Sequence, residues 1–547
     1  MPATEENQAK TSYKDWPNDA AFDASFTSPT PIELKVVGTF PPQLAGTLYR
    51  TGPGSYKVDS EKGEYARSHW FDGFSQLHRF QIVPDGSGSC RVYYTSRSQV
   101  DDLIERARKT GHLDGIITFG QKRDPCVSFF EKVKSVFQPS RPDSRIPGMA
   151  NVAVTVRPNM PGMPKGTLTN LTDANQIQYS DINTLEPVGV TSQASLHPDL
   201  KACLHHSGNG PLSCAHARYD QVTGDLYNYN LNFGLSGGAY RIFKTSADTG
   251  KTEIIATIRG PGVKAAYIHS FFLTEDFIIL CVWPLYFTGH GASVLWGRNI
   301  IDALKFNPHA QTKWYVVDRK GGRGQVVTFQ SPAFFSFHTV NAFQEAKSEK
   351  GTVDILCDII QYPDDRLMRN LYYENVLSTG SGRPPHESAS PTFVRYKLAG
   401  VPMKGRIPKG KIRSAEIIKA VKGAGELPTL NPHYGTKKQR YTYGIVDRGY
   451  SSFVDGLGKI DLETNEITYW GKEPKPHTPG EAIFVSDGTD ESEDAGYLLS
   501  VVLDGEKGTS YLMCLNARDM TEVARAEIDH AISITLHGTH VRDPVGC

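Results

Sequence analysis

Four histidines in apolar or small-residue surroundings are the side chains of this sequence best suited to chemistry. They are His216, between two alanines, His269, before Ser-Phe-Phe, His338, in Phe-Ser-Phe-His-Thr, and His537, in Thr-Leu-His-Gly. A lone imidazole buried in a strand costs free energy unless it is bonded to something. Imidazole ligands suit zinc, copper, iron and nickel, so the four residues predict a metal centre without naming the metal.

The alternative for each histidine is a core ring bonded to a backbone carbonyl, which is commoner for any single residue. The chain has 17 histidines, and it is the shared context of these four that favours a metal. A ligating histidine normally gives its other ring N–H to a carboxylate or carbonyl. The acidic residues next to apolar strands that could serve are Asp173, Glu426 and Glu481, for which a turn or helix-cap carboxylate is the alternative.

Other chemistries lack their motifs. The sequence contains no Walker loop, no G-x-G-x-x-G after a strand and no H-E-x-x-H. The formal net charge is zero, which favours neither a nucleic acid nor an anionic membrane as partner.

A metal ligand as late in the chain as His537 requires the last segment to return to the middle of the fold, as it does when a ring of β-blades is closed. The remaining pattern agrees, because short apolar strands alternate with turns that begin with Asp, Asn or Ser and bond their own backbone. Their uneven spacing does not allow the blades to be counted. These turns are 181–186, 220–225, 246–251, 461–466 and 516–522.

The composition fits one long all-β unit. Gly and Pro number 51 and 34 and are spread evenly, as in a chain of many turns. We expect a mobile N-terminal tail over residues 1–31 and a single β-propeller domain over residues 32–547. The polar N-terminus lacks the apolar core of a signal peptide, and the 8 cysteines show no C-x-x-C pair. We therefore expect a soluble, cytoplasmic protein.

Four segments are predicted to lie outside the strands. Residues 101–109 form a plausible first helix. Residues 129–137 place their apolar side chains on one stripe of a helix, which either packs on the body or dips into a bilayer as a peripheral membrane contact. Residues 285–307 and 364–391 are long excursions of the kind that cover a site.

Taken together, these residues resemble the carotenoid cleavage oxygenase family from about Val37 to Val541. The four histidine contexts carry the resemblance, together with motifs in a fixed order along the chain. These motifs are Gly46-Thr47-Leu48-Tyr49-Arg50 with Gly52-Pro53, His69-Trp70-Phe71-Asp72-Gly73, Glu426 ahead of Tyr441-Thr442-Tyr443-Gly444, Glu481-Ala482-Ile483-Phe484-Val485, and Leu536-His537-Gly538.

The resemblance implies an all-β, seven-bladed β-propeller with helical and loop insertions over its top face. It also implies Fe(II) on His216, His269, His338 and His537, steadied by Asp173, Glu426 and Glu481. Asp173 departs from the family's usual glutamate, and its shorter side chain requires a small shift or a water to reach a histidine. The implied reaction adds molecular oxygen across one C=C bond of a conjugated polyene or stilbene, giving two carbonyl products.

The branch of the family follows from fewer residues. Stilbene-cleaving relatives grip a phenol with a lysine and a tyrosine, where this chain has Thr172 and Lys122, and the loss of both favours an apolar polyene. The surroundings of Asp173 and His216 look most like the fungal torulene-cleaving members. Alternatives are a stilbene or phenolic-alkene oxygenase, in which Lys122 holds the phenol in another pose, a retinoid-type isomerohydrolase, and a non-enzymatic propeller. The aromatic residues expected to stabilise cationic character on the substrate are Phe71, Trp283, Phe287 and Phe337.

Overall fold

The structure is a computed structural model that describes residues 13–122, 146–200, 212–234, 237–320, 322–346, 351–380, 390–408, 410–471, 473–488 and 490–542. The predicted apolar helix at residues 129–137 lies outside these ranges. No helix in the described part of the chain is long and apolar enough to cross a membrane.

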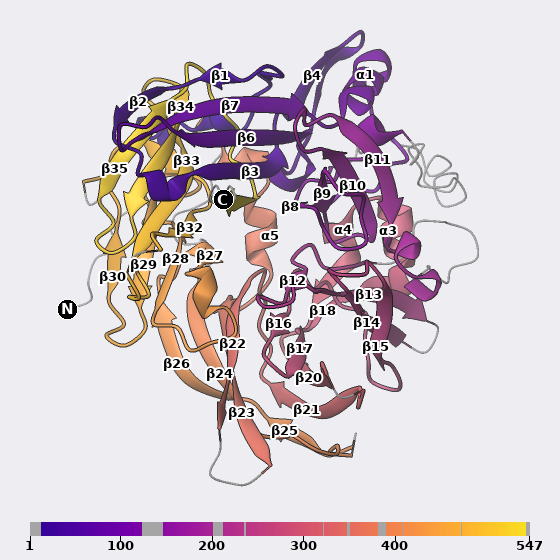
Figure 1. Cartoon of the computed structure of the whole chain (residues 1–547). Helices are drawn as coiled ribbons and strands as arrows, with labels where there is room; N and C mark the ends of the chain where they lie inside the picture. The colour runs from indigo at the N-terminus through magenta and orange to yellow at the C-terminus, as the bar shows by residue number, and fades with distance from the viewer. Residues whose placement is uncertain are drawn as a thin grey trace, which may run out of the picture.

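Seven sheets of four to six strands follow one another around a ring, so the predicted seven-bladed propeller is confirmed. In Figure 1 the blades run clockwise in chain order, from the indigo strands at the top to the yellow strands at the upper left. The neighbouring pairs within the blades are antiparallel, except for β21 and β25, which run parallel. The blades are numbered 1 to 7 in this order.

Blades 1 and 7 combine strands from both ends of the chain. Blade 1 consists of β1 (Ile32–Glu33), β7 (Cys90–Ser98), β6 (Ser75–Pro84), β3 (Gly46–Pro53) and β36 (His537–Arg542). Blade 7 consists of β2 (Lys35–Gly38), β35 (Glu522–Glu527), β34 (Thr509–Asn516), β33 (Gly496–Asp504) and β31 (His477–Pro479), with β32 (Ile483–Ser486) also paired to β33.

Blades 2 to 4 are built from consecutive chain segments. Blade 2 consists of β8 (Thr155–Pro158), β9 (Thr167–Leu171), β10 (Gln176–Asp181) and β11 (Pro187–Ser192). Blade 3 consists of β12 (Arg218–Tyr219), β13 (Leu226–Gly234), β14 (Gly237–Thr245) and β15 (Thr252–Ile258). Blade 4 consists of β16 (Phe272–Leu273), β17 (Phe277–Val282), β20 (Thr312–Asp318), β21 (Gln325–Ser331) and β25 (Ile412–Ser414).

Blades 5 and 6 complete the ring. Blade 5 consists of β22 (Thr339–Ala346), β23 (Thr352–Gln361), β24 (Thr392–Pro402) and β26 (Glu416–Lys422). Blade 6 consists of β27 (Glu426–Thr429), β28 (Tyr441–Val446), β29 (Gly456–Asp461) and β30 (Ile467–Tyr469). Two short hairpins lie outside the blades, β4 (Lys57–Ser60) with β5 (Gly63–Ala66) and β18 (Leu285–Phe287) with β19 (Leu304–Phe306).

The ring is closed by β36, the last strand, which pairs antiparallel with β3 near the other end of the chain. In this register Arg50 lies opposite Gly538 and Thr51 opposite His537. A Cβ atom at position 538 would lie 2.5 Å from Cδ of Arg50 and 2.6 Å from the carbonyl oxygen of Tyr49, so only glycine fits there. The return of the C-terminal segment that His537 predicts is therefore present.

The five predicted turns are all hairpins of the blades, and in each the first side chain bonds the turn's own backbone. The Oδ1 atom of Asp181, for example, accepts a hydrogen bond from the backbone N–H of Thr184 at 2.8 Å. Each turn also has one residue with a positive φ near its end. These residues are Leu185, Gly224, Gly250, Asn465 and Met520.

The helices lie in the insertions. The predicted first helix is α1 (Asp101–Thr110), which begins with two acidic residues and ends at Gly111, whose φ of 70° terminates it. The excursion at 285–307 contains α3 (Ala292–Gly297) and α4 (Ile300–Ala303). The excursion at 364–391 contains α5 (Arg366–Asn370) and α6 (Tyr373–Val376).

The segment predicted as a mobile tail is partly described. Residues 1–12 lie outside the described ranges, but residues 13–31 lie against the propeller. Trp16 is buried and its indole N–H donates to Thr478 at 3.1 Å. Phe22 is buried with its ring edge-on to Trp70 and Phe453. These aromatic residues anchor a segment that is polar on average. The division of the chain into an N-terminal tail and a single domain stays a prediction.

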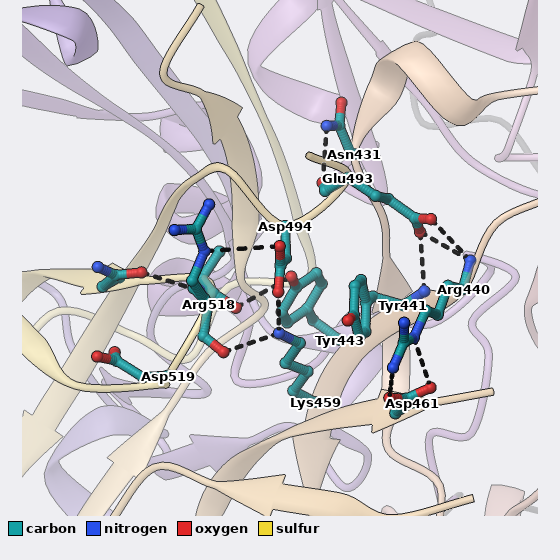
Figure 2. A network of polar contacts seen from close by, with 12 residues as sticks. Asn431, Arg440, Tyr441, Tyr443, Lys459, Asp461, Glu493, Asp494, Arg518 and Asp519 are labelled. Atoms are coloured by element: carbon teal, nitrogen blue, oxygen red, sulfur yellow. Dashed lines mark hydrogen bonds and ion pairs between the residues drawn. The ribbon is translucent and has the colours of Figure 1, made fainter. Parts of the chain in front are cut away.

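A buried ion pair joins blades 6 and 7 (Figure 2). Lys459, from β29, lies 2.6 Å from the carboxylate of Asp494 and donates to the backbone carbonyl of Arg518 at 2.8 Å. Its ammonium also lies 4.0 Å from the centre of the Tyr441 ring. Both charged residues are less than a tenth exposed, so each depends on the other to compensate for lost hydration.

We therefore predict that Lys459→Met lowers the free energy of unfolding by about 3–5 kcal/mol, because it removes the nearest partner of a buried carboxylate and leaves it only the more distant Arg518, at 3.8 Å. The matched control is Lys35→Met, which removes a solvent-exposed pair with Glu527 and should cost less than about 1 kcal/mol. Guanidinium-induced unfolding measures both variants. Equal losses in the two variants would contradict the importance given to the buried pair.

Candidate metal centre

Every blade contributes one residue to a cluster at the centre of the ring. Six of the seven contributing segments lie at or near the strand that ends the sheet on one side, whereas Asp173 lies in the turn between the inner strands β9 and β10. Neighbouring blades contact one another on this side, as β36 contacts β8 and β16 contacts β22. Blades 1, 3, 4 and 5 supply His537, His216, His269 and His338, and blades 2, 6 and 7 supply Asp173, Glu426 and Glu481.

The four predicted histidines come together with ligand atoms that all lie within 4.8 Å of one another. The Nε2 atoms of His216 and His269 are 3.1 Å apart, and those of His338 and His537 are 3.3 Å apart. His269, His338 and His537 are buried and His216 is partly buried. The cluster therefore presents four ring nitrogens to one small volume.

Each of the three predicted carboxylates bonds the outward-facing Nδ1 atom of one histidine. The distances are 2.7 Å from Asp173 to His269, 2.5 Å from Glu426 to His338 and 2.7 Å from Glu481 to His537. A carboxylate at Nδ1 holds the proton there, which leaves the lone pair of Nε2 directed at the centre. No carboxylate partner of His216 is found among the described residues.

Asp173 reaches His269 in spite of its shorter side chain. The same oxygen, Oδ2, accepts a second hydrogen bond from the hydroxyl of Tyr267 at 2.6 Å. Oδ1 accepts the backbone N–H of Ala215 at 3.1 Å. The backbone of the neighbouring blade and a tyrosine two residues before His269 thus fix the aspartate, and no bridging water is needed.

Glu481 is held by an arginine from the closing strand pair. Nη1 of Arg50 lies 3.0 Å from Oε2 of Glu481, and the backbone N–H of Gly538 donates to the same oxygen at 2.9 Å. Arg50 is 1 % exposed, so this pair is shielded from water. The sequence motifs around Arg50 and Gly538 therefore serve the same carboxylate, which in turn orients His537.

The environment favours the neutral form of His216 and His338 and the ionised form of Glu426 and Glu481. Burial lowers the pKa of His338 to about 4, although the charge of Glu426 acts in the opposite direction. Burial and the other three histidines lower the pKa of His216 well below its usual range. Burial, the largest single influence, raises the pKa of Glu426 and Glu481, but the bonded histidine and the hydrogen bonds that each carboxylate accepts together outweigh it and lower both pKa values.

This arrangement fits a transition-metal ion. Neutral imidazole is the form that binds metals, and four such ligands suit iron, zinc, copper or nickel. The carboxylates lie behind the histidines and do not reach the centre themselves. From there they offset the charge of a cation and leave coordination positions open for small molecules.

A cavity of about 570 Å³ extends from the metal centre beneath the insertions. His269, His338 and His537 form part of its wall. Phe287 and Ile300 of one excursion and Leu367 and Leu371 of the other also line it, so both excursions cover the site as predicted. Its volume lies in the range of about 300–1,000 Å³ that is typical of ligand pockets.

Aromatic rings make up much of the cavity wall near the histidines. Of the four predicted rings, Phe71, Phe287 and Phe337 line the cavity. Trp283 does not, because it is fully buried in the core next to the rings of Phe334 and Phe335. Rings that the sequence did not single out also line the cavity, namely Trp70, Phe119, Phe233, Tyr362 and Phe453.

Thr172 and Lys122, which occupy the positions where stilbene-cleaving relatives bind a phenol, lie in different places relative to the cavity. Thr172 lines the cavity, next to Asp173. Lys122 is about half exposed, pairs with Glu374 at 2.7 Å and lies over the ring of Tyr372, outside the cavity wall. A lysine in that position offers no grip on a phenol inside the cavity.

Tyr267 and Arg50 complete the site, and sequence reasoning did not assign either of them. Tyr267 precedes His269 by two residues, and alternate residues of an extended segment point to the same side. That spacing is a signal that could have been used. Arg50 lay inside a recognised motif, but its contact with Glu481 joins residues 431 positions apart and has no local signature.

Comparisons with known proteins agree on one family. The family described as retinal pigment epithelial membrane protein matches residues 21–542. A carotenoid dioxygenase of Neurospora crassa is 40% identical, covering 97% of this chain and 92% of that protein. A torulene dioxygenase of Gibberella fujikuroi is 38% identical, covering 97% and 94%. A human mitochondrial carotenoid-cleaving dioxygenase is 27% identical, covering 94% and 89%.

The solved structures agree with the fold. A Glu-to-Asp variant of Synechocystis apocarotenoid oxygenase superposes with a TM-score of 0.73 at 22% identity, covering 98% of this chain and all of that one (100%). A cobalt-substituted form of the same oxygenase gives a TM-score of 0.70 at 22% identity, with the same coverage of 98% and 100%.

The depressed histidine pKa values predict acid sensitivity of the metal-free protein. Buried His338 and His69 have pKa values of about 4, whereas an unfolded histidine titrates near 6.5. As the pH falls from 7 to 5 the unfolded chain takes up protons that the folded chain does not, so stability decreases. Each such histidine contributes up to about 1.4 kcal/mol per pH unit. Unfolding of chelator-treated protein at several pH values measures this slope, which His338→Asn should reduce. An unchanged slope in the variant would show that His338 titrates normally in the fold.

Proposed function

Because the chain belongs to the family of the retinal pigment epithelial membrane protein and the carotenoid oxygenases, we propose that it is a non-haem iron dioxygenase that cleaves one C=C bond of a carotenoid or apocarotenoid. The products are two carbonyl compounds. The observation that carries this proposal is the convergence of four imidazoles at one end of an aromatic cavity.

Fe(II) is the proposed metal, and His216, His269, His338 and His537 are the proposed ligands. When bound, the iron would supply the activation of molecular oxygen. Asp173, Glu426 and Glu481 hold the Nδ1 protons of three of the ligands and so direct the Nε2 lone pairs of those three histidines at the centre. They act as positioning residues, since none of them is among the converging ligand atoms.

The cavity residues bind and orient the polyene. Phe337 lies with its ring centre 5.5 Å from that of His269, and Phe71 lies 5.8 Å from Phe337. These faces can stabilise positive charge that develops on the conjugated chain, at about 0.5–2 kcal/mol for each well-placed ring. The same rings exclude water from the bond that is cut.

The substrate class follows from what the cavity lacks. Thr172 lines the wall and Lys122 is paired outside it, so neither supplies a phenol-binding ammonium. This favours a torulene-like polyene over a stilbene, in agreement with the relatives' names. A retinoid-type isomerohydrolase and a non-enzymatic propeller remain the alternatives that experiment must exclude.

The iron content of the protein tests the proposed ligands. Purified protein should contain close to one iron per chain, and His338→Ala should lose it. Glu481→Gln should retain the fold but bind iron about 10–100-fold more weakly, because its histidine is no longer oriented. His112→Ala is the control, since this histidine is exposed and pairs only with Asp114. Iron content of all four proteins after reconstitution decides the ligand assignment, and retention of iron by His338→Ala would refute it.

The reaction is tested with torulene, a β-apocarotenal and a hydroxystilbene in detergent. Aldehydes should appear only in the presence of oxygen and only from the polyenes, with label from ¹⁸O₂ in both products. Label in neither product would identify an isomerohydrolase. Iron-loaded protein that cleaves none of these compounds would favour the binding module.

We also propose peripheral membrane contact through residues 129–137, which lie outside the described ranges. Their apolar stripe is the supporting observation. Replacing Phe130 and Phe137 with Ser should reduce cosedimentation with liposomes by roughly tenfold or more while leaving iron content unchanged. Equal sedimentation of variant and wild type would refute the contact.

A further inference from the structure

A buried arginine forms part of the cavity wall and has unused hydrogen-bond donors. Arg67 follows the β4–β5 hairpin, is 3 % exposed and lines the same cavity as His269. Its Nε and Nη1 atoms are buried and have no hydrogen-bond partner among the described residues. A guanidinium is always charged and carries five N–H donors, so unspent donors in a buried site call for an explanation.

The protein surrounds this guanidinium with rings and provides no anion in contact with it. Its carbon Cζ lies 5.0 Å from the ring centre of Phe74 and 5.8 Å from that of Tyr65. Such contacts compensate part of the lost hydration, but they leave the Nε and Nη1 donors unbonded.

The nearby polar groups of the wall are already used. Both carboxylate oxygens of Asp72 accept backbone N–H groups, from Phe119 and Gly120, at 2.7 Å each. The amide of Asn151 donates to the carbonyl of Gly73 at 2.9 Å and accepts from the N–H of Ser75 at 2.9 Å. Arg67 is therefore the group in this part of the wall with donors to offer a ligand.

A cluster of aromatic rings in the cavity wall adjoins the metal centre. Phe337 adjoins His269, Phe71 adjoins Phe337, and Phe119 lies 4.9 Å from Phe71 between ring centres. Asp72, which directly follows Phe71, holds the backbone of Phe119. Arg67 lines the same cavity as these rings, so a conjugated chain with its reacting bond at the histidines can extend through the cavity to Arg67.

We propose that Arg67 binds an acceptor oxygen, a carbonyl or carboxylate, at the end of the polyene remote from the bond that is cut. The preferred ligand class is then an apocarotenoid with an oxidised end, in addition to pure hydrocarbons. This inference rests on the proposed function, because it assumes a polyene in the cavity. A carboxylate is the strongest form of the ligand, since it pairs the buried cation with two acceptor oxygens.

Binding is measured first on the iron-loaded wild type, by quenching of tryptophan fluorescence. The probes are a β-apocarotenoic acid, the corresponding β-apocarotenal and torulene. The wild type should bind the acid at least tenfold more tightly than Arg67→Met does. It should bind the aldehyde severalfold more tightly than the variant does. Arg67→Lys keeps the charge but lacks the planar fork and should restore only part of the difference. Arg106→Met, on the exposed face of α1, is the matched control.

Turnover gives the second readout. The ratio of kcat/KM for the apocarotenal to that for torulene should fall about tenfold or more in Arg67→Met, mainly through KM, while Arg106→Met keeps the wild-type ratio. Iron content and the melting temperature establish that each variant is folded. If Arg67→Met does not fold, the Arg67→Lys variant and the wild-type preference for acid over hydrocarbon carry the test.

The inference is overturned if acid, aldehyde and hydrocarbon lose affinity equally in Arg67→Met, or if the wild type binds the acid no better than torulene. These results are separable from failure of the proposed function. If the protein cleaves no polyene but binds the acid through Arg67, the proposed oxygenase activity is refuted and the role of Arg67 stands. If it cleaves polyenes with no dependence on Arg67, the oxygenase activity stands and the role of Arg67 is refuted.

Discussion

The pairing of the last strand with β3 is the constraint on which the rest of the structure depends. It closes the ring, and in the same register it places His537 beside the three other histidines. It also brings Gly538 against Arg50 so closely that no side chain fits at position 538. Arg50 and the Gly538 N–H then bond Glu481, which orients His537. Fold closure and ligand orientation are thus one set of contacts.

The second requirement is electrostatic. Four imidazoles must be neutral and turned inward in a buried centre, and both conditions come from their surroundings. Burial lowers the pKa of His216 and His338, and a carboxylate on the outer side of three of the four rings fixes where the proton lies. Because each blade supplies one residue, the geometry depends on the whole ring and not on a local motif. The arrangement tolerates an aspartate at position 173 in place of a glutamate, because Tyr267 and Ala215 hold the shorter side chain in position.

The cavity adds a different kind of selectivity. Its wall near the metal is aromatic, which suits a conjugated hydrocarbon, and its polar groups are mostly bonded to the protein itself. Arg67 departs from this pattern, because donors left unbonded in a buried site are costly. An enzyme that forms carbonyl products has a use for such a group, since products and partly oxidised substrates carry the acceptor that a hydrocarbon lacks.

The sequence alone determined the strands and turns, the family and the residues of the candidate metal centre. Strands and hairpin turns follow from local periodicity and from side chains that bond their own backbone, as Asp181 and Asp461 do. The histidines stood out because an isolated imidazole in an apolar strand requires a partner. Tertiary structure alone decided which groups meet across the ring. Trp283 packs in the core while Phe119 lines the cavity, and Arg50 and Arg67 acquire their surroundings from segments far away in the chain. Burial and contact between distant segments are properties of the closed ring, and no local pattern encodes them.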